Sequence, residues 1–354
     1  MKEFSVFSDT RKTYQSMLKD IREAKKSVFL ETYIYEKDDI GRKFRDLLIK
    51  KAKEGIEVKV LIDSWASNVD KDFFKKLVSV GGEVRFFREF RYVVRIFSKN
   101  HERNHRKLLL VDKEIAYLGS LNIMKEALDW RELVLKLKGP IAQDFESSFF
   151  QSWEIYGKFT KVKMKNLIHK GFEIIPDKPS NIYRPVEKRY KTLIRFAKEQ
   201  ILMETPYFVP SRRIKRAIMG ASRRGVKVIL IVPKVSDVKP VDILSNRYFG
   251  KLYKSGVQIF YYNSKDHQKI LHSKLLIVDN KVFILGSSNV DYRSFIHNYE
   301  LNLLGRNREI VRELKRHFQE TLSKCERFNY AQWRSRSSFS KMLEMFLGWI
   351  REYF

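Results

Sequence analysis

Two sets of six residues share one internal spacing and carry side chains suited to phosphate chemistry. The first is His105, Lys107, Asp112, Gly119, Ser120 and Asn122, and the second, 167 positions later throughout, is His272, Lys274, Asp279, Gly286, Ser287 and Asn289. A repeat that served packing would keep apolar positions, whereas this one keeps a base, a cation, a carboxylate, a hydroxyl and an amide. We therefore expect one phosphate-handling site built from two halves.

A pair of histidines with a pair of lysines suits exchange at a phosphodiester. One neutral imidazole can attack phosphorus to form a phosphohistidine, while the other protonates the leaving alkoxide and then takes a proton from the incoming alcohol or water. Histidine fits both roles because its pKa lies near neutrality. The two lysines neutralise charge in the transition state, and the phosphate-binding donors we expect are Ser120, Asn122, Ser287 and Asn289.

Four carboxylates accompany the two motifs. Glu132 and Glu300 follow the histidines by about 27 residues in strand-like stretches and are candidates to fix an imidazole tautomer. Asp112 and Asp279 belong to the motifs but fall at hairpin turns, so we expect them to hold turn backbone or lysine in place. No Cys/His cluster has the spacing of a metal site, and the chemistry requires neither a metal nor another cofactor.

The elements around each motif repeat as well. Each half reads as a strand, an amphipathic helix, a glycine stop and further strands, followed by a hairpin that carries the motif. The ranges are 29–35, 40–54, 58–62 and 84–87 in the first half, and 201–205, 211–224, 226–232 and 257–261 in the second. Parallel strands with right-handed crossovers follow from this order.

This pattern predicts an α/β fold of two pseudo-symmetric domains, each a mixed β-sheet flanked by helices, with the active site at their interface. We expect a first domain over 1–157, a connector over 158–187 that contains several Pro and Lys residues, a second domain over 188–328 and a C-terminal amphipathic helix over 329–354.

The duplicated H-x-K-x4-D-x6-G-S-x-N motif resembles the phospholipase D superfamily, and further segments are similar to bacterial cardiolipin synthases. These segments are Asn104 to Asp112, Trp130 to Glu132, Glu204 to Ser211, and Asn289 to Phe295 with Asn298 to Glu300. The resemblance implies two phospholipase D-like domains, with His105 as nucleophile and His272 as acid and base. It implies transfer of a phosphatidyl group, typically from phosphatidylglycerol, to a second phospholipid, giving cardiolipin. The chain departs from the pattern at Ser120, Glu132 and His297, and we expect it to act without the transmembrane helices that often precede the catalytic part.

Three other functions stay open. A hydrolytic phospholipase D would hand the same intermediate to water. A nuclease of the superfamily would also suit a basic protein, although the aromatic segments and the apolar tail favour lipid. A non-catalytic binder of anionic lipid is disfavoured by two intact motifs.

Composition sets the class of partner. The chain has 354 residues and a formal net charge of +29, which calls for a polyanion; we expect an anionic phospholipid membrane and phospholipid substrates, and do not expect nucleic acid. One cysteine, Cys325, excludes an intrachain disulfide. The N-terminus lacks a signal peptide, and no apolar run is long enough to span a bilayer. We expect a peripheral protein on the cytoplasmic face of the cell membrane. The oligomeric state stays open.

Two segments mix apolar and basic residues and are candidates for membrane contact. Residues 339–350 place apolar side chains at helical spacing, which fits either a terminal helix docked on the core or an interfacial helix. Residues 88–99 precede the first motif and fit either a buried connecting helix or a lipid-facing segment. The expected membrane contacts are Phe90, Val93, Phe97, Phe346, Trp349 and Ile350.

Overall fold

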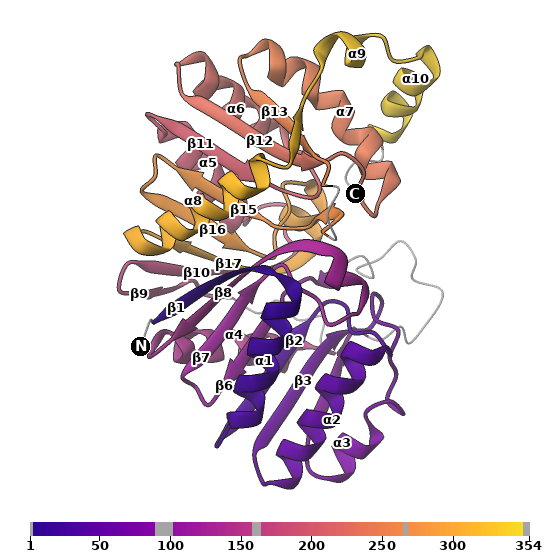
Figure 1. Cartoon of the computed structure of the whole chain (residues 1–354), viewed down its shortest axis with the longest axis vertical. Helices are drawn as coiled ribbons and strands as arrows, with labels where there is room; N and C mark the ends of the chain where they lie inside the picture. Colours follow the sequence, from indigo (N-terminus) through magenta and orange to yellow (C-terminus); the bar gives the residue numbers. More distant parts are fainter. Residues whose placement is uncertain (1–2, 89–101, 158–163, 265–267, 350–354) are drawn as a thin grey trace.

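The fold consists of two mixed β-sheets with helices on their outer faces, and a related strand order occurs in both (Figure 1). It is seen in a computed structural model that describes residues 3–88, 102–157, 164–264 and 268–349. The two-half α/β architecture expected from the repeat is confirmed.

The first sheet has the strand order β1-β8-β7-β6-β2-β3-β4. Strands β2, β3 and β4 are parallel and the others pair antiparallel. The strands are β1 (Phe4–Asp9), β2 (Ser27–Thr32), β3 (Glu57–Asp63), β4 (Glu83–Phe87), β6 (Leu108–Val111), β7 (Ile115–Gly119) and β8 (Trp130–Lys138). Helices α1 (Thr10–Glu23), α2 (Asp39–Lys53) and α3 (Lys75–Ser79) pack with the outer face.

The second sheet repeats this order, because β17-β16-β15-β11-β12-β13 corresponds to β8-β7-β6-β2-β3-β4. Its strands are β9 (Leu167–His169), β10 (Phe172–Asp177), β11 (Gln200–Glu204), β12 (Lys227–Pro233), β13 (Gln258–Tyr262), β15 (Leu275–Val278), β16 (Val282–Gly286), β17 (Asn298–Gly305) and β18 (Cys325–Arg327). The helices on its outer face are α5 (Pro185–Phe196), α6 (Arg212–Arg223) and α7 (Lys239–Lys254).

Local sequence signals explain where the equivalent helices α2 and α6 begin and end. The Asp38 side chain accepts from two backbone N–H groups at the start of α2, and Ser211 caps α6 in the same way through one. Gly55 and Gly225 follow the helices with φ of +79° and +89°, a conformation that favours glycine. The chain then enters β3 and β12, whose apolar side chains are buried.

A shared hydrophobic core joins the two halves. It contains residues of both sheets together with the inner sides of α4 (Ile141–Ile155) and α8 (Arg308–Leu322), among them Phe29, Phe145, Leu285 and Leu314. In Figure 1 these two helices lie in the middle of the molecule, where the sheets meet. Because each half contributes apolar surface to one core, burial of that surface stabilises the assembled pair.

Two short strands exchange between the halves and bring the motifs together. Strand β5 (Arg103–Asn104) precedes the first motif but pairs with β17 of the second sheet, and β14 (Ile270–Leu271) precedes the second motif but pairs with β8 of the first. The backbone N–H of His105 donates to the Tyr299 carbonyl, and that of His272 to the Arg131 carbonyl, both at 2.9 Å. Each histidine is thereby fixed to the opposite half.

The segment expected to connect the halves contributes regular structure. Within 158–187, residues 167–169 and 172–177 form β9 and β10 of the second sheet, and β10 occupies the place beside β17 that β1 occupies beside β8. The prolines suggested a break in structure. Pro176, however, lies where β10 extends past β9, at an edge that does not require its missing N–H.

The chain ends in α9 (Tyr330–Arg334) and α10 (Ser338–Leu347), which pack on α7. In the part of the chain that the structure describes, no helix has the length and apolarity needed to cross a bilayer.

Candidate active site

A pocket of about 360 Å³ lies where the two halves meet, and the histidines of both motifs line it. The first half supplies the aromatic side chains of Tyr33, Trp65 and Trp130. The second half supplies Tyr207, Asp237, Asp291, Arg293 and Asn298. The expectation that one site draws on both motifs therefore agrees with the geometry.

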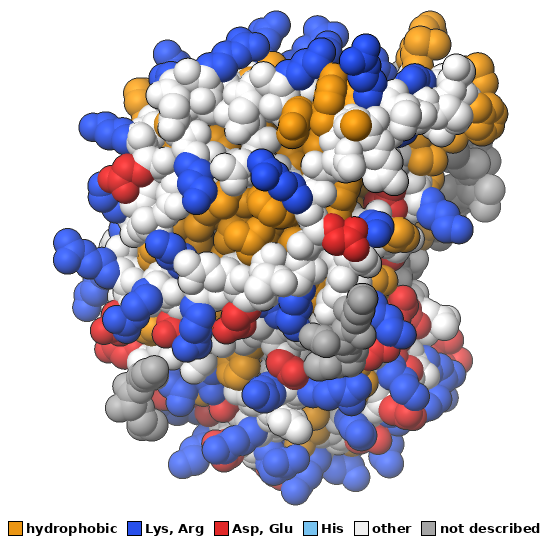
Figure 2. Space-filling model, turned by 45° about the horizontal axis from the view of Figure 1, so that its top comes forward, with side chains coloured by type: hydrophobic (Ala, Val, Ile, Leu, Met, Phe, Trp, Pro, Cys, Tyr) orange, Lys and Arg blue, Asp and Glu red, His pale blue; other side chains and the backbone are white. Residues whose placement is uncertain are grey.

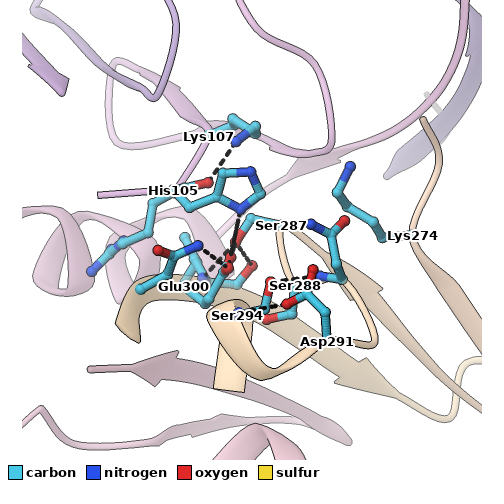
Figure 3. Close-up of polar contacts among 12 residues, drawn as sticks. His105, Lys107, Lys274, Ser287, Ser288, Asp291, Ser294 and Glu300 are labelled. Carbon is cyan, nitrogen blue, oxygen red and sulfur yellow. Dashed lines mark hydrogen bonds and ion pairs between the residues drawn. The ribbon is translucent and has the colours of Figure 1, made fainter. Parts of the chain in front are cut away.

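Each histidine is held by a carboxylate from the opposite half. The Nδ1 atom of His105 lies 3.0 and 3.1 Å from the two carboxylate oxygens of Glu300, and Nδ1 of His272 lies 2.8 Å from Oε1 of Glu132 (Figure 3 shows the first pair). The sequence indicated both carboxylates but did not assign them to histidines. Since Nδ1–H donates to an ionised carboxylate, the lone pair is left on Nε2, the atom available for chemistry at phosphorus.

Aromatic rings fix the planes of both imidazoles. Tyr33 meets His105 edge to face with ring centroids 4.8 Å apart, and Trp130 meets His272 at the same separation. Trp130 and Asn298 stand at equivalent positions of the two halves, directly before Arg131-Glu132 and Tyr299-Glu300. Because an asparagine stands at the position equivalent to Trp130, the pocket is more apolar beside His272 than an exact repeat of the second half would make it.

Burial keeps the imidazoles neutral in the free protein. It lowers the pKa of His105 to about 3, an effect that the neighbouring Glu300 opposes without cancelling, and it lowers the pKa of His272 as well. Burial alone would raise the pKa of Glu132 and Glu300, but the imidazoles, hydroxyls and lysines around them hold both values below the usual range. A neutral imidazole beside an ionised carboxylate is the state that a nucleophile requires.

The two motif lysines lie beside the histidines. Lys107 donates to the His105 carbonyl at 2.6 Å and Lys274 to the His272 carbonyl at 2.7 Å; in Figure 3 they stand on different sides of His105. Burial lowers the pKa of Lys274 to about 8 and that of Lys107 well below its ordinary value. Two buried ammonium groups that are short of counter-charge favour an anionic ligand between them.

The motif serines make a different contact from the phosphate contact we expected. The hydroxyl of Ser120 donates to Glu132 and that of Ser287 to Glu300, and both serines are buried. A hydroxyl whose proton is committed to a carboxylate orients that carboxylate, so these serines support the histidine partners from behind.

The asparagines, by contrast, line the pocket. Asn122 accepts from the Ile34 N–H at 3.3 Å, and Oδ1 of Asn289 is buried without a hydrogen-bond partner among the described residues. A buried polar atom without a partner is uncommon and points to a contact made with substrate.

The motif glycines allow close packing of strands. A Cβ on Gly119 would lie 2.2 Å from the Leu133 carbonyl oxygen, and one on Gly286 would lie 2.3 Å from that of Leu301. The hairpins can pair with β8 and β17 at these points only without a side chain.

The motif aspartates lie outside the pocket, among the contacts that hold the hairpin turns. Asp112 accepts from the backbone N–H groups of residues 25–27, and Asp279 from those of residues 198–200. Each aspartate thus ties its turn to the strand that begins the neighbouring βαβ unit, which is a structural role.

Comparison with known proteins decides the family. A family model described as "Cardiolipin synthase, PLD-like domain" matches residues 17–153 and 190–322. The cardiolipin synthase of Clostridium perfringens (strain SM101 / Type A) is 31% identical over 97% of this chain and 75% of its own length. The major cardiolipin synthase of Bacillus subtilis (strain 168) is 31% identical over 96% of this chain and 73% of its own. The chain belongs to the cardiolipin synthase family of phospholipase D-like proteins.

A solved structure shows the same fold. Phosphatidylserine synthase from Haemophilus influenzae aligns with a TM-score of 0.77 over 100% of this chain and 96% of its own, at 13% identity. The phospholipase D-like fold is therefore kept where little sequence identity remains.

Sequence reasoning did not single out several residues that line the phospholipase D-like pocket. These are Tyr33, Trp65, Tyr207, Asp237, Asp291, Arg293 and Asn298. Four of them, Tyr207, Asp291, Arg293 and Asn298, lie in segments that resemble cardiolipin synthases, but no role was predicted for them. Most follow the carboxyl ends of strands, where loops of an α/β sheet carry binding residues, and that rule could have found Trp65 after β3 and Asp237 after β12.

The expected membrane contacts divide into two groups. Phe346 and Trp349 are 66% and 85% exposed, whereas Phe90, Val93, Phe97 and Ile350 lie outside the described residues.

Proposed function

We propose that the protein transfers a phosphatidyl group from a donor such as phosphatidylglycerol to the hydroxyl of a second phospholipid, giving cardiolipin. The strongest support for this proposal is that the histidines of both motifs line one pocket, each with Nδ1 bound to a carboxylate of the other half. Similarity to cardiolipin synthases over nearly the whole chain supports this choice of donor and acceptor.

In the first step, Nε2 of His105 attacks the phosphorus of the donor. The P–O bond to the headgroup breaks as the N–P bond forms, and the leaving alkoxide takes a proton from His272, which is neutral in the free protein and takes up this proton as the anionic donor binds. Glu300 and Glu132 stabilise the positive charge that the imidazoles carry during this exchange. The low pKa of His105 supports its role as the neutral nucleophile.

In the second step, the acceptor hydroxyl gives its proton to Nε2 of His272 and attacks phosphorus from the side that the first alkoxide left. The N–P bond breaks and His105 is regenerated. One phosphodiester replaces another, so the exchange is close to isoenergetic. Lys107 and Lys274 stabilise the phosphoryl oxygens as charge shifts, while Asn122 and Asn289 bind the substrate throughout.

An apolar wall supports a lipid alcohol over water as acceptor. Trp65, Trp130, Ile34 and Val238 give the pocket an apolar part beside its charged and amide side chains. A lipid that fills this space excludes solvent from the intermediate.

We also propose that the protein acts as a peripheral protein at the cytoplasmic face of the membrane. One side of α10 packs on α7, where Arg247 donates to the Glu344 carbonyl at 3.4 Å, and the ion pair between Arg336 and Glu344 holds α10 to the turn that precedes it. The other side, with Trp349 just beyond the helix, exposes Phe339, Met342, Met345, Phe346 and Trp349 by 55 to 85%. In Figure 2 apolar side chains gather at the upper right, the place of α10 in Figure 1. Aromatic and apolar residues on an exposed helix suit the bilayer interface.

The test is incubation with vesicles of phosphatidylglycerol and mass analysis of the products. We expect cardiolipin and glycerol from the native protein and neither from His105→Asn. Phosphatidic acid as main product would instead identify a hydrolase. Deletion of residues 338–354 should reduce vesicle pelleting while turnover of dispersed short-chain substrate persists; unchanged pelleting would exclude α10 as a membrane contact.

A further inference from the structure

A second pocket, of about 350 Å³, lies on the second half outside the active site, between the first turns of α5 and α6. Five of its lining residues are cationic: Arg184, Lys188, Arg189, Lys191 and Arg213. None of them belongs to the repeated motifs, and the proposed transfer reaction makes no use of this pocket.

Only two of these five cations form ion pairs with acidic residues. Arg184 lies 3.3 Å from Glu187, and Arg189 lies 2.7 Å from Glu173. Among the described residues, no ion pair is formed by Lys188, Lys191 or Arg213, two of which are exposed. The pocket therefore carries a surplus of three positive charges, which favours an anionic ligand.

Helix α6 and the neighbouring α7 carry further cations outside the pocket. Burial lowers the pKa of Lys215 on α6, and the cations Lys251, Arg212, Arg216 and Arg247 lower it further. Basic side chains also predominate over the upper part of the molecule in Figure 2. Such a potential attracts an anionic surface.

Apolar side chains stand at the rim of the pocket. Ile182 is 95% exposed and Tyr183 is 52% exposed. The loop that carries them is fixed, because Ser180 N–H donates to the Ile296 carbonyl at 2.9 Å and the Ser180 hydroxyl accepts from both rim residues. Cations beside exposed apolar groups match the boundary between lipid headgroups and acyl chains.

The pocket opens at the same end of the second sheet as the active site. Helix α5 begins after β10, whose last residue Asp177 pairs with Glu300, and α6 begins after β11, whose last residue Glu204 pairs with Leu275 next to Lys274. A flat membrane that reached the active-site pocket could therefore meet this pocket as well.

We propose that this pocket binds the phosphate headgroup of an anionic phospholipid in the membrane and holds the active site toward the bilayer. The inference rests on the proposed action on membrane phospholipids and adds a binding site separate from that of the reacting lipids. Lys188, Lys191 and Arg213 contact the phosphate, and Ile182 enters the acyl boundary. Buried Oδ1 of Asn166, which has no partner in the described part of the chain, can accept from a headgroup hydroxyl.

The test compares two triple variants of the full chain. In one, Lys188→Gln, Lys191→Gln and Arg213→Gln remove the three uncompensated charges. The control carries Lys50→Gln, Lys53→Gln and Arg223→Gln, which remove the same charges from exposed positions where α2 and α6 end, away from the active-site end. Pelleting is measured with phosphatidylcholine vesicles with and without phosphatidylglycerol, and turnover is measured with dispersed short-chain phosphatidylglycerol.

We expect the pocket variant to lose at least about tenfold in affinity for the anionic vesicles, with unchanged turnover of dispersed substrate, and the control to lose far less. Ile182→Ser should weaken vesicle binding without changing net charge. Equal losses in the two triple variants, or a loss of dispersed-substrate turnover in the pocket variant, would overturn the proposal. So would inorganic phosphate that raises the melting temperature of the native protein but not of the pocket variant, since the site would then take soluble phosphate. Absence of turnover by the native protein would contradict the transfer reaction, while the pelleting result would still decide the lipid site.

Discussion

His105 and Glu300 are 195 positions apart in the chain, yet His105 Nδ1 lies 3.0 Å from a Glu300 carboxylate oxygen. His272 and Glu132 repeat the contact in the opposite direction at 2.8 Å. Neither motif histidine is therefore bound to the glutamate of its own half; each is bound to the glutamate of the other. The exchanged strands β5 and β14 make this arrangement obligatory, because they anchor each histidine on the other sheet.

Glu300→Gln should slow the reaction without unfolding the protein. The amide can donate to Nδ1 and stabilise the tautomer whose lone pair points away from phosphorus. We expect kcat to fall between about 10²- and 10⁴-fold, as measured by product formation under saturating lipid. Glu114→Gln, at an exposed hairpin position, is the matched control. A loss below threefold, as an approximate threshold, would show that the carboxylate does not set the tautomer.

Ser120→Ala and Ser287→Ala should lower kcat more than they raise KM. Each hydroxyl supports a carboxylate rather than substrate, and a hydrogen bond to a charged group is worth about 1.5–3 kcal/mol, or tenfold and more in rate. Asn122→Ala and Asn289→Ala serve as the comparison, because those side chains line the pocket and should raise KM. The reverse pattern would return the serines to the phosphate-binding role.

Catalytic efficiency should decline above about pH 8. Burial lowers the pKa of Lys274 to about 8, so its positive charge is present below that pH and is lost as the pH rises through it. When substrate is bound, its phosphodiester anion stabilises the charged form of Lys274 and raises the pKa of that lysine. The alkaline decline of kcat should therefore occur at higher pH than that of kcat/KM. Lys274→Arg should shift the alkaline limb of kcat/KM upward, because a guanidinium remains charged. An unshifted limb would assign the titration to another group.

Asp279→Ala should cost stability more than chemistry. Although burial alone would raise the pKa of Asp279, the backbone N–H groups of residues 198–200 hold it below the usual value. Removing this acceptor should lower the free energy of unfolding by about 2 kcal/mol in urea titration. Activity per folded molecule should persist at low temperature. A fully folded but inactive variant would give the aspartate a direct part in the reaction.

The repeat was sufficient to predict the two-sheet fold and the pocket shared by both histidines. The spacing between polar residues can be read directly from the sequence. Each strand, helix and helix-ending glycine also has a local sequence signal. The pairing of His105 with Glu300 was not predictable in this way, because it depends on two strands of two residues each that change sheets. Strands so short leave no periodicity to detect.

The roles of small motif residues were also beyond reach of the sequence. Ser120 was expected to bind phosphate, yet its hydroxyl contacts Glu132, and Gly119 packs against the Leu133 backbone; both contacts depend on the register between β7 and β8. The same holds for β10, whose proline suggested a connector although hydrogen bonding to β17 makes it a strand.

The most direct test of the account uses His272→Asn and a phosphatidyl ester with a nitrophenolate leaving group. This leaving group requires no acid, so the intermediate should form on His105, while its breakdown, which requires a base, should stall. Quenching at high pH and peptide mass analysis should find the phosphatidyl group on His105, and His105→Asn should show neither adduct nor a burst of nitrophenolate. A burst from His105→Asn, or an adduct on any other residue, would contradict the account.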